Sequence, residues 1–349
     1  MHTFYYPDHI KHDPHQLHKE DTPRQNEYYC EVAERGIIIH DAIQQANLGP
    51  ITPPGDFGIE PINEVHEYGL INLLQSAYQR MKTESDGTLA VPDTFSVGRL
   101  PHRKPRSIWG QLGYYCFDTS SPILEHTWDV AYWGAQTALS AAALVLAGLE
   151  TEGMPISYAL CRPPGHHAAQ NLFGGFCYLN NAAIAAHWLV QQGKRVAILD
   201  IDYHHGNGTQ AIFYGRSDVL VCSIHADPLN EYPYFWGYGD EYGSGGGQGF
   251  NWNYPLPRGT REPEYLQALA DALVRVRLYV PDVLIVCLGV DTYEKDPAGG
   301  FRLQTESFAR IGERIADTRL PVVVIQEGGY HLPTLGENVL YFFKGLLGK

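Results

Sequence analysis

ILDIDYHHGN, residues 198–207, joins an apolar segment to a run of polar side chains. The apolar beginning of this stretch is typical of a strand that is buried in a parallel sheet. Alternate side chains of a strand point to one face, so Asp200, Asp202 and His204 are expected to share a face. Two buried carboxylates and an imidazole repel and desolvate one another unless a cation lies among them. The stretch therefore predicts a metal site at the end of a strand.

Apolar strand segments alternate with amphipathic helical segments along the second half of the chain. The predicted strands are Ser157–Cys161, Arg195–Ile201, Val219–Ile224, Val283–Val290 and Val322–Gln326. The predicted helices are Thr127–Ala147, Asn180–Gln192, Pro263–Leu278 and Glu306–Ala316. This alternation predicts an α/β fold, in which a predominantly parallel sheet has helices on both faces.

Polar residues cluster directly after these predicted strands. They are Arg162–His167, Asp200–Asn207, Ser223–His225, Asp291 and Glu327–Tyr330. Ligands of open parallel sheets bind outside the carboxyl ends of the strands. We therefore expect the five segments to converge on one site.

Length and charge limit the classes of protein to be considered. A chain of 349 residues with 44% hydrophobic content can form one large domain or two smaller ones, and no stretch resembles a flexible linker. We therefore expect a single catalytic domain over residues 1–349. The net charge of −14 argues against nucleic acid as a partner and is compatible with a cationic substrate.

Cysteine usage and hydropathy favour a cytoplasmic location. The six cysteines are scattered without a CxxC pair, and several lie in apolar segments, as reduced buried cysteines do. The first thirty residues contain no apolar signal core, and the apolar stretch Ala141–Leu149 is too short to span a bilayer. We expect no membrane association.

Asp202, His204 and Asp291 are the candidate metal ligands. Three such ligands leave a coordination position open for water and a substrate oxygen, as in catalytic zinc sites. Asp291 could instead cap a turn at the end of its strand. A two-metal site of the arginase type would require a further carboxylate two residues after Asp291, where the chain has Tyr293. One metal ion is therefore favoured over two.

The adjacent imidazoles of His166 and His167 follow a Pro-Pro-Gly turn. Histidine titrates near neutrality, so one imidazole could activate a water while the other adjusts the charge and orients the leaving group. The pair could also be structural, or both residues could bind metal. The position of the turn at a strand end favours catalysis.

Two aromatic features are candidates for the substrate pocket. Tyr330 follows Glu327-Gly-Gly, and a phenol facing the metal could stabilise a tetrahedral oxyanion. The segment Phe173–Phe176 has a glycine turn that includes Gly175, and Phe176 together with Phe235 could form the walls of a narrow channel. Each of these aromatic residues could equally be an ordinary packed side chain.

Residues 84–122 interrupt the strand and helix pattern with turn residues, aromatic residues and a basic run at Arg99–Arg106. The segment is predicted to be a long inserted loop, and ordered loops of this length usually have a function.

The chain resembles the histone deacetylase and acetylpolyamine amidohydrolase superfamily, strongly from Tyr114 onward and loosely before it. The motifs RPPGHH, GGFCYLNN, DIDYHHGNGTQ, GVDTYEKDP and EGGY carry this resemblance, in this order. It implies an arginase-like or deacetylase-like α/β fold with the active site at the carboxyl ends of the strands. The implied activity is the zinc-dependent hydrolysis of an acetylated amine to acetate and a free primary amine; the same ligands also suit iron(II).

Catalytic roles also follow from the resemblance. His167 is implied to be the general base, His166 its electrostatic partner and Tyr330 the residue that stabilises the oxyanion, while a protonated histidine supplies the proton to the departing amine. Asp200 lies behind His166 in the family pattern. The amide of Asn207 stands where class I deacetylases have a carboxylate, so the chain resembles the class II and bacterial branches.

A structural potassium ion is a further implication. Its ligands would be Asp200, Asp202, Ser223 and the main-chain oxygens of His204 and Ile224.

The substrate class follows from the loops around the predicted site. HADPLNEYPYFWGYGDEYG and NYPLPRGT are closest to the acetylpolyamine amidohydrolases, in which an insert like residues 84–122 forms a homodimer and narrows the entrance to slender cationic substrates. Asp118 matches a carboxylate at the pocket rim that holds the substrate backbone. A protein lysine deacetylase, a deacylase of another small amine and a non-catalytic binder of acetylated ligands remain as alternatives.

Overall fold

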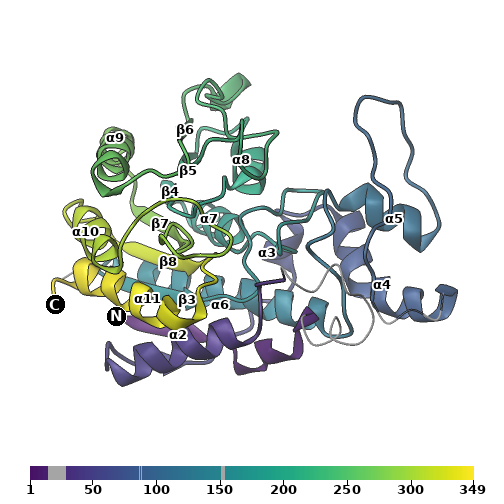
Figure 1. Ribbon diagram of the computed structural model, residues 1–349, viewed down its shortest axis with the longest axis horizontal. Coiled ribbons are helices and arrows are strands. Elements are labelled where there is room, and N and C mark those ends of the chain that lie inside the picture. Colours follow the sequence, from purple (N-terminus) through teal and green to yellow (C-terminus); the bar gives the residue numbers. More distant parts are fainter. Residues whose placement is uncertain (15–28, 86, 88, 151–153) are drawn as a thin grey trace.

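A parallel sheet of eight strands forms the centre of the computed structural model, which describes residues 1–14, 29–85, 87, 89–150 and 154–349 (Figure 1). The strands are β1 (His2–Tyr5), β2 (Ile51–Thr52), β3 (Ile156–Leu160), β4 (Val196–Asp200), β5 (Val219–Ala226), β6 (Asn251–Leu256), β7 (Val283–Leu288) and β8 (Val322–Gln326). Their order across the sheet is β2-β1-β3-β8-β7-β4-β5-β6, and every described pairing between them is parallel. All their carboxyl ends therefore lie at one edge of the sheet.

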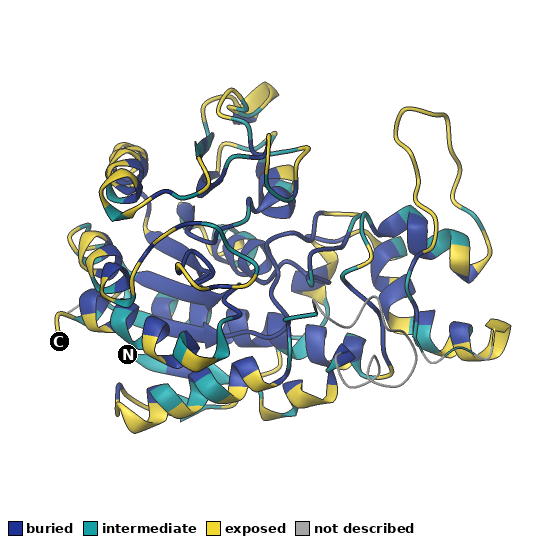
Figure 2. Ribbon diagram, viewed as in Figure 1, coloured by how far each residue is buried: buried dark blue, intermediate teal, exposed yellow. Residues whose placement is uncertain are grey.

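Helices cover both faces of this sheet. They are α2 (Glu34–Gln45), α3 (Glu60–Asn63), α4 (Tyr68–Ser85), α5 (Ile108–Tyr115), α6 (Thr127–Gly148), α7 (Asn181–Gln191), α8 (Asn207–Phe213), α9 (Glu262–Tyr279), α10 (Thr305–Ala316) and α11 (Leu332–Leu347), with short 3-10 turns η1 (Pro7–Lys11) and η2 (Gly245–Gly247). One hydrophobic cluster joins α3 to α7 to one face, and a second joins α2, α9, α10 and α11 to the other. The dark strands and two-coloured helices of Figure 2 show this arrangement.

The strand β4 shows why the sequence folds into this layered structure. Val196 and Ile198 belong to the first cluster, whereas Ala197 and Leu199 belong to the second. Because successive side chains of a strand point to opposite faces, a strand with helices on both sides must be apolar at every position. The α/β fold prediction and the parallel sheet are confirmed.

The helix α6 has the length and hydropathy of a membrane-spanning helix, but 67% of its apolar window is buried inside the protein. It packs against α7 and β3 as part of the first hydrophobic cluster. Its hydropathy is thus that of a core helix.

The insert at residues 84–122 is only partly a loop. Its second half contains α5, and Leu112 and Tyr115 of this helix are buried in the first hydrophobic cluster. Residues 93–104 are exposed and form the long loop that projects beside α5 in Figures 1 and 2. The pattern of turn residues predicted the loop, whereas the short apolar stretch of α5 was too brief to indicate a helix.

Candidate metal centre and active site

The three predicted metal ligands converge at the carboxyl ends of β4 and β7. His204 Nδ1 lies 3.1 Å from Asp291 Oδ2 and 3.3 Å from Asp202 Oδ1. One ligand atom from each of the three residues lies within 4.8 Å of the other two. Both carboxylates are buried, whereas the imidazole of His204 is partly accessible from the pocket.

Backbone amides orient the two carboxylates. Gly328 N–H donates to Asp202 Oδ2 at 2.8 Å, and Tyr203 N–H donates to Asp291 Oδ1 at 2.9 Å. Burial and the neighbouring Asp202 carboxylate raise the pKa of Asp291 to about 7. Two buried carboxylates beside one imidazole require a compensating cation, and this donor set of one nitrogen and two oxygens fits a divalent ion such as zinc.

The close approach of the Gly328 backbone explains the glycine that follows Glu327. A Cβ atom on Gly328 would lie 2.4 Å from Asp291 Oδ2 and 2.5 Å from Asp202 Oδ2. Any side chain at this position would therefore push the two carboxylates apart. The glycine is required by the ligand geometry.

His166 lies beside this group and is held by a carboxylate. Its Nδ1 lies 3.0 Å from Asp200 Oδ2, and its ring centroid lies 4.0 Å from that of His167. Burial acts to lower the pKa of His166, but Asp200 and Asp202 outweigh it and raise the pKa to about 10. The two carboxylates therefore favour the imidazolium form of His166.

His167 has the opposite electrostatic environment. Its Nδ1 lies 2.7 Å from Asn207 Oδ1, an acceptor without charge, so the ring carries its proton on Nδ1 and leaves Nε2 free. Burial and the neighbouring His166 and His204 hold the pKa of His167 well below its usual value. A neutral imidazole with a free Nε2 can accept a proton.

Tyr330 projects from the turn after β8 into the same cavity. Arg35 of α2 lies over its ring, with Cζ 4.6 Å from the ring centroid, and donates to the main-chain oxygens of Gly329 at 2.6 Å and Glu327 at 2.7 Å. Burial raises the pKa of Tyr330 well above its usual value. The phenol therefore stays protonated and can donate a hydrogen bond.

Of the site residues, His167, His204 and Tyr330 line a cavity of about 610 Å³. It is lined by Tyr29, Cys30, Asp118, Thr119, Ser120, His167, Gly175, Phe176, His204, Tyr232, Pro297, Ala298 and Tyr330. Asp118 Oδ2 accepts from Gly175 N–H at 2.9 Å and from the Tyr232 hydroxyl at 2.8 Å. Most of the lining side chains are aromatic or small, and the carboxylate of Asp118 carries their only negative charge.

Phe235 is the predicted channel residue that the structure does not bring into the cavity. Its side chain is 74% exposed, and it contacts Tyr234 and Trp236 outside the lining. Tyr232 lies there instead, with its ring 5.1 Å from that of His167. The run Tyr-Pro-Tyr-Phe-Trp has no periodicity that indicates which of its aromatic side chains points inward.

The residues predicted to bind potassium lie together on β4, β5 and the loop after β4. Asp200 pairs with Ser223 in the sheet register, next to Ile224. His225 donates from Nε2 to Gly237 O at 2.8 Å, so its Nδ1 accepts the Ser223 hydroxyl proton at 2.8 Å. His205 Nδ1 lies 3.4 Å from the same oxygen and can donate to it, so one lone pair of the Ser223 oxygen remains available to a cation.

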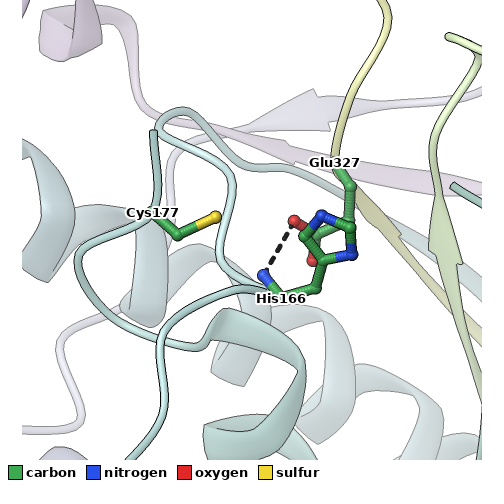
Figure 3. A group of neighbouring side chains, drawn as sticks. All are labelled: His166, Cys177 and Glu327. Carbon is green, nitrogen blue, oxygen red and sulfur yellow. Dashed lines mark hydrogen bonds between the residues drawn. The ribbon is translucent and has the colours of Figure 1, made fainter. Parts of the chain in front are cut away.

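His166 also belongs to a second group of side chains with metal-binding chemistry, together with Cys177 and Glu327 (Figure 3). Glu327 Oε2 accepts from Gly165 N–H at 2.7 Å and from His166 N–H at 3.2 Å. Burial raises the pKa of Glu327 to about 7 and that of the Cys177 thiol well above its usual value, and the thiol donates to Gly175 O. The group thus holds the turn of the two histidines. Sequence reasoning assigned no role to Glu327 or Cys177.

The fold and the site define an α/β protein with three candidate metal ligands at the carboxyl ends of a parallel sheet. The chain belongs to the histone deacetylase domain family, whose match covers residues 19–346. This membership confirms the predicted superfamily and the arginase-like or deacetylase-like fold.

Relatives with assigned activities cover nearly the whole chain. An acetylpolyamine amidohydrolase 1 of Pseudomonas aeruginosa is 46% identical over 91% of each chain, and an acetylpolyamine amidohydrolase of Burkholderia pseudomallei is 43% identical over 99% of this chain and 98% of its own. The crystal structure of an acetylpolyamine aminohydrolase from Burkholderia pseudomallei covers 99% of this chain and 98% of its own at 42% identity, with a TM-score of 0.91. Like the other members of this family, the protein is a hydrolase that acts on amide bonds.

Proposed function

We propose that this protein is a zinc-dependent amidohydrolase that removes acetyl groups from acetylpolyamines such as acetylputrescine, acetylspermidine and acetylcadaverine. The observation that carries the proposal is that His204, one of three grouped candidate metal ligands, lines one cavity together with a neutral His167 and a protonated Tyr330. The activities assigned to the relatives in Pseudomonas aeruginosa and Burkholderia pseudomallei support the same reaction.

The protein side chains divide the reaction among them. His167 accepts the proton of the attacking water at Nε2, while Asn207 holds the other ring nitrogen. The Tyr330 hydroxyl donates to the oxygen of the acetyl carbonyl as negative charge develops there. A protonated imidazole of the His166 and His167 pair then supplies a proton to the departing amine. Acetate and a free primary amine are the products.

A divalent metal ion on Asp202, His204 and Asp291 would polarise the acetyl carbonyl and make the attacking water more acidic. We propose zinc as this ion, with iron(II) as the alternative, because ligands of this type suit both. The cation fits because the two carboxylates and the imidazole need a positive charge among them.

The lining of the cavity suits a slender cationic amine. Aromatic walls, which include Phe176 and Tyr232, suit an aliphatic amine chain, and the carboxylate of Asp118 lies in the lining. The net charge of −14 favours encounter with a cationic substrate. We propose no role for nucleic acid or membrane as a partner.

Other parts of the proposal concern the assembly. We propose one catalytic domain over residues 1–349, a structural potassium ion on Asp200, Asp202, Ser223 and the main-chain oxygens of His204 and Ile224, and a homodimer formed through the insert at residues 84–122. Exposed apolar side chains of the insert, among them Val97 and Leu100, support the dimer.

We also propose a cytoplasmic location, which is supported by the six free cysteines.

The decisive experiment compares initial rates of the zinc-loaded protein on N-acetylputrescine, an acetylspermidine and an acetyl-lysine peptide. We expect kcat/KM to be far higher for the two polyamines. A preference for the peptide would make the protein a lysine deacetylase. Absence of turnover on all three, with zinc bound, would refute the proposed reaction.

A further inference from the structure

The backbone around Tyr330 is held by a carboxylate outside the group of metal ligands and general bases. Asp296 Oδ2 accepts from Tyr330 N–H at 2.6 Å and from His331 N–H at 3.0 Å. Asp296 Oδ1 accepts from Ala298 N–H at 3.0 Å. The side chain of Asp296 is buried, with 7% of the residue exposed.

These three hydrogen bonds join two walls of the cavity. Tyr330 lies on one wall, and Pro297 and Ala298 line another, so Asp296 links them from behind. Asp296 N–H also donates to Tyr293 O at 3.0 Å, which fixes its own backbone. The carboxylate therefore couples the turn after β7 to the turn after β8.

The turn that carries Asp296 begins at a metal ligand. Asp291 is its first residue, and Gly299 packs so closely on the Asp291 main chain that a Cβ there would lie 1.8 Å from Asp291 O. This turn is therefore anchored tightly to the metal centre. A side chain fixed on it provides a reference point for the position of Tyr330 relative to the metal.

We propose that Asp296 is a positioning residue. It fixes the Tyr330 hydroxyl at the position, relative to the metal ligands, where it can donate a hydrogen bond to the acetyl oxygen. The inference rests on the proposed function, because the negative charge that Tyr330 would stabilise is the one that develops on the acetyl oxygen during the proposed reaction. A displacement of about 1 Å at a catalytic group lowers turnover by up to about a hundredfold. The backbone amide of Tyr330 is the attachment point of the side chain, so loss of its acceptor displaces the phenol.

Only a carboxylate satisfies all three donors. An asparagine has one acceptor oxygen, so its NH₂ group would face either the two amides of Tyr330 and His331 or the amide of Ala298. Asp296→Asn therefore keeps the volume of the side chain while removing at least one of its hydrogen bonds. We expect kcat on N-acetylputrescine to fall by about tenfold to a hundredfold, with KM changed by less than about threefold.

The matched control is Asp282→Asn. Asp282 Oδ2 also accepts a backbone amide, that of Arg195 at 2.8 Å, but it precedes β7 at the opposite end of that strand. We expect its kcat to stay within about twofold of the wild-type value, since surface changes away from special features have small effects. Metal content and Tm are measured for both variants. If Asp296→Asn does not fold, Asp296→Ser, whose hydroxyl can accept one amide, replaces it.

A double-mutant cycle with Tyr330→Phe separates positioning from general stability. If Asp296 acts through the Tyr330 hydroxyl, Asp296→Asn has no further effect on turnover once that hydroxyl is absent. A trifluoroacetylated amine, which has a more electrophilic carbonyl, keeps the residual rates measurable. Losses in kcat that multiply across the two variants would overturn the inference.

Binding of a short alkyl hydroxamate, measured by calorimetry, tests Asp296 without turnover. The hydroxamate carbonyl can accept the Tyr330 hydroxyl, so we expect Asp296→Asn to weaken binding by about threefold to tenfold in the wild-type background and by less than about twofold in the Tyr330→Phe background. Equal weakening in both backgrounds would overturn the positioning role. An inactive wild-type enzyme would refute only the proposed function, because this binding cycle still decides the role of Asp296.

Discussion

Tyr330 has one polar atom that can act on the substrate, its hydroxyl, and burial keeps that hydroxyl protonated. We expect Tyr330→Phe to lower kcat by about a hundredfold to a thousandfold, the usual loss when one oxyanion donor is removed. Measurement of kcat and KM on N-acetylputrescine checks this. Tyr132→Phe removes a hydroxyl that binds Asp56 at the surface and should leave kcat unchanged. Full activity of Tyr330→Phe would exclude the oxyanion role.

His167 owes its neutral state partly to its uncharged partner, Asn207. In Asn207→Asp, the new carboxylate would stabilise the imidazolium form, so the pKa of His167 should rise. A general base works only when it is unprotonated, so the acid limb of the kcat/KM profile should move to higher pH. Profiles of both proteins between pH 5 and 9, about the range in which histidine titrates, test the shift. An unchanged acid limb would show that another group is the base.

At the scale of single residues, the sequence indicated the polar side chains that converge at the site better than the residues that hold their turns in place. Asp202, His204 and His167 stand out because their residue types have few uses other than chemistry at a strand end. Asp296 and Glu327 act on backbone amides that are distant in sequence, at separations fixed only by the tertiary fold. Tyr232 replaced Phe235 in the cavity for a similar reason, since loop conformation decides which aromatic residue points inward.

The turn at the end of β8 carries the buried carboxylate of Glu327, whose contribution to the free energy of folding depends on pH. The pKa of Glu327 is raised from 4.5 to about 7 by burial, so the folded protein binds a proton that the unfolded chain releases above about pH 4.5. Folding is therefore favoured by this group at low pH, and the benefit is lost as the pH rises from about 4.5 through 7.

Glu327→Gln removes this ionisation and keeps an amide oxygen that can accept from Gly165 and His166. As the pH rises from 5 to 8, we expect the unfolding free energy of the variant to increase by about 1–3 kcal/mol relative to that of the wild type. Urea unfolding of both proteins at pH 5 and at pH 8 measures this change. A constant difference across this range would show that Glu327 does not titrate there.

Elements were predictable where burial imposed a pattern. The predicted strands 322–326 and 219–224 begin at the observed first residues of β8 and β5, because a buried parallel strand is apolar throughout. The strand β6 was not predicted, since it lies at the edge of the sheet and contains two asparagines and Pro255. The two-residue strand β2, at the other edge, is too short to show any period.

At the scale of the whole molecule, the proposed metal ion would stabilise the fold as well as take part in the reaction. The buried carboxylates of Asp202 and Asp291 lie beside the imidazole of His204, and His166 Nε2 lies 3.9 Å from Asp202 Oδ1. A cation bound among them would stabilise the two carboxylates further. A metal that binds only the folded state at about a thousand times its Kd adds about 4 kcal/mol. Chelation should therefore abolish turnover and lower Tm, and added zinc should restore both. An unchanged Tm after the metal has been removed would indicate that the ion contributes nothing to folding.

The insert at residues 84–122 has an exposed loop that carries large apolar side chains. Val97 and Leu100 are 56% and 66% exposed on a loop that projects away from the sheet (Figure 2). An isolated monomer would leave this loop with little to pack against, whereas a second copy could cover it. The homodimer proposal therefore depends on these two side chains.

The double variant Val97→Ser, Leu100→Ser should convert the dimer to a monomer, because it removes the apolar area that a second copy would bury. Sedimentation of the wild type and the variant at matched concentration measures the change. Leu278→Ser provides the control: Leu278 is 71% exposed, on α9, and its loss should leave the dimer intact. If the insert also narrows the entrance, the monomeric variant should hydrolyse acetyl-lysine peptides relatively better than the wild type does. A wild-type monomer, or a variant that still dimerises, would remove the insert from the interface.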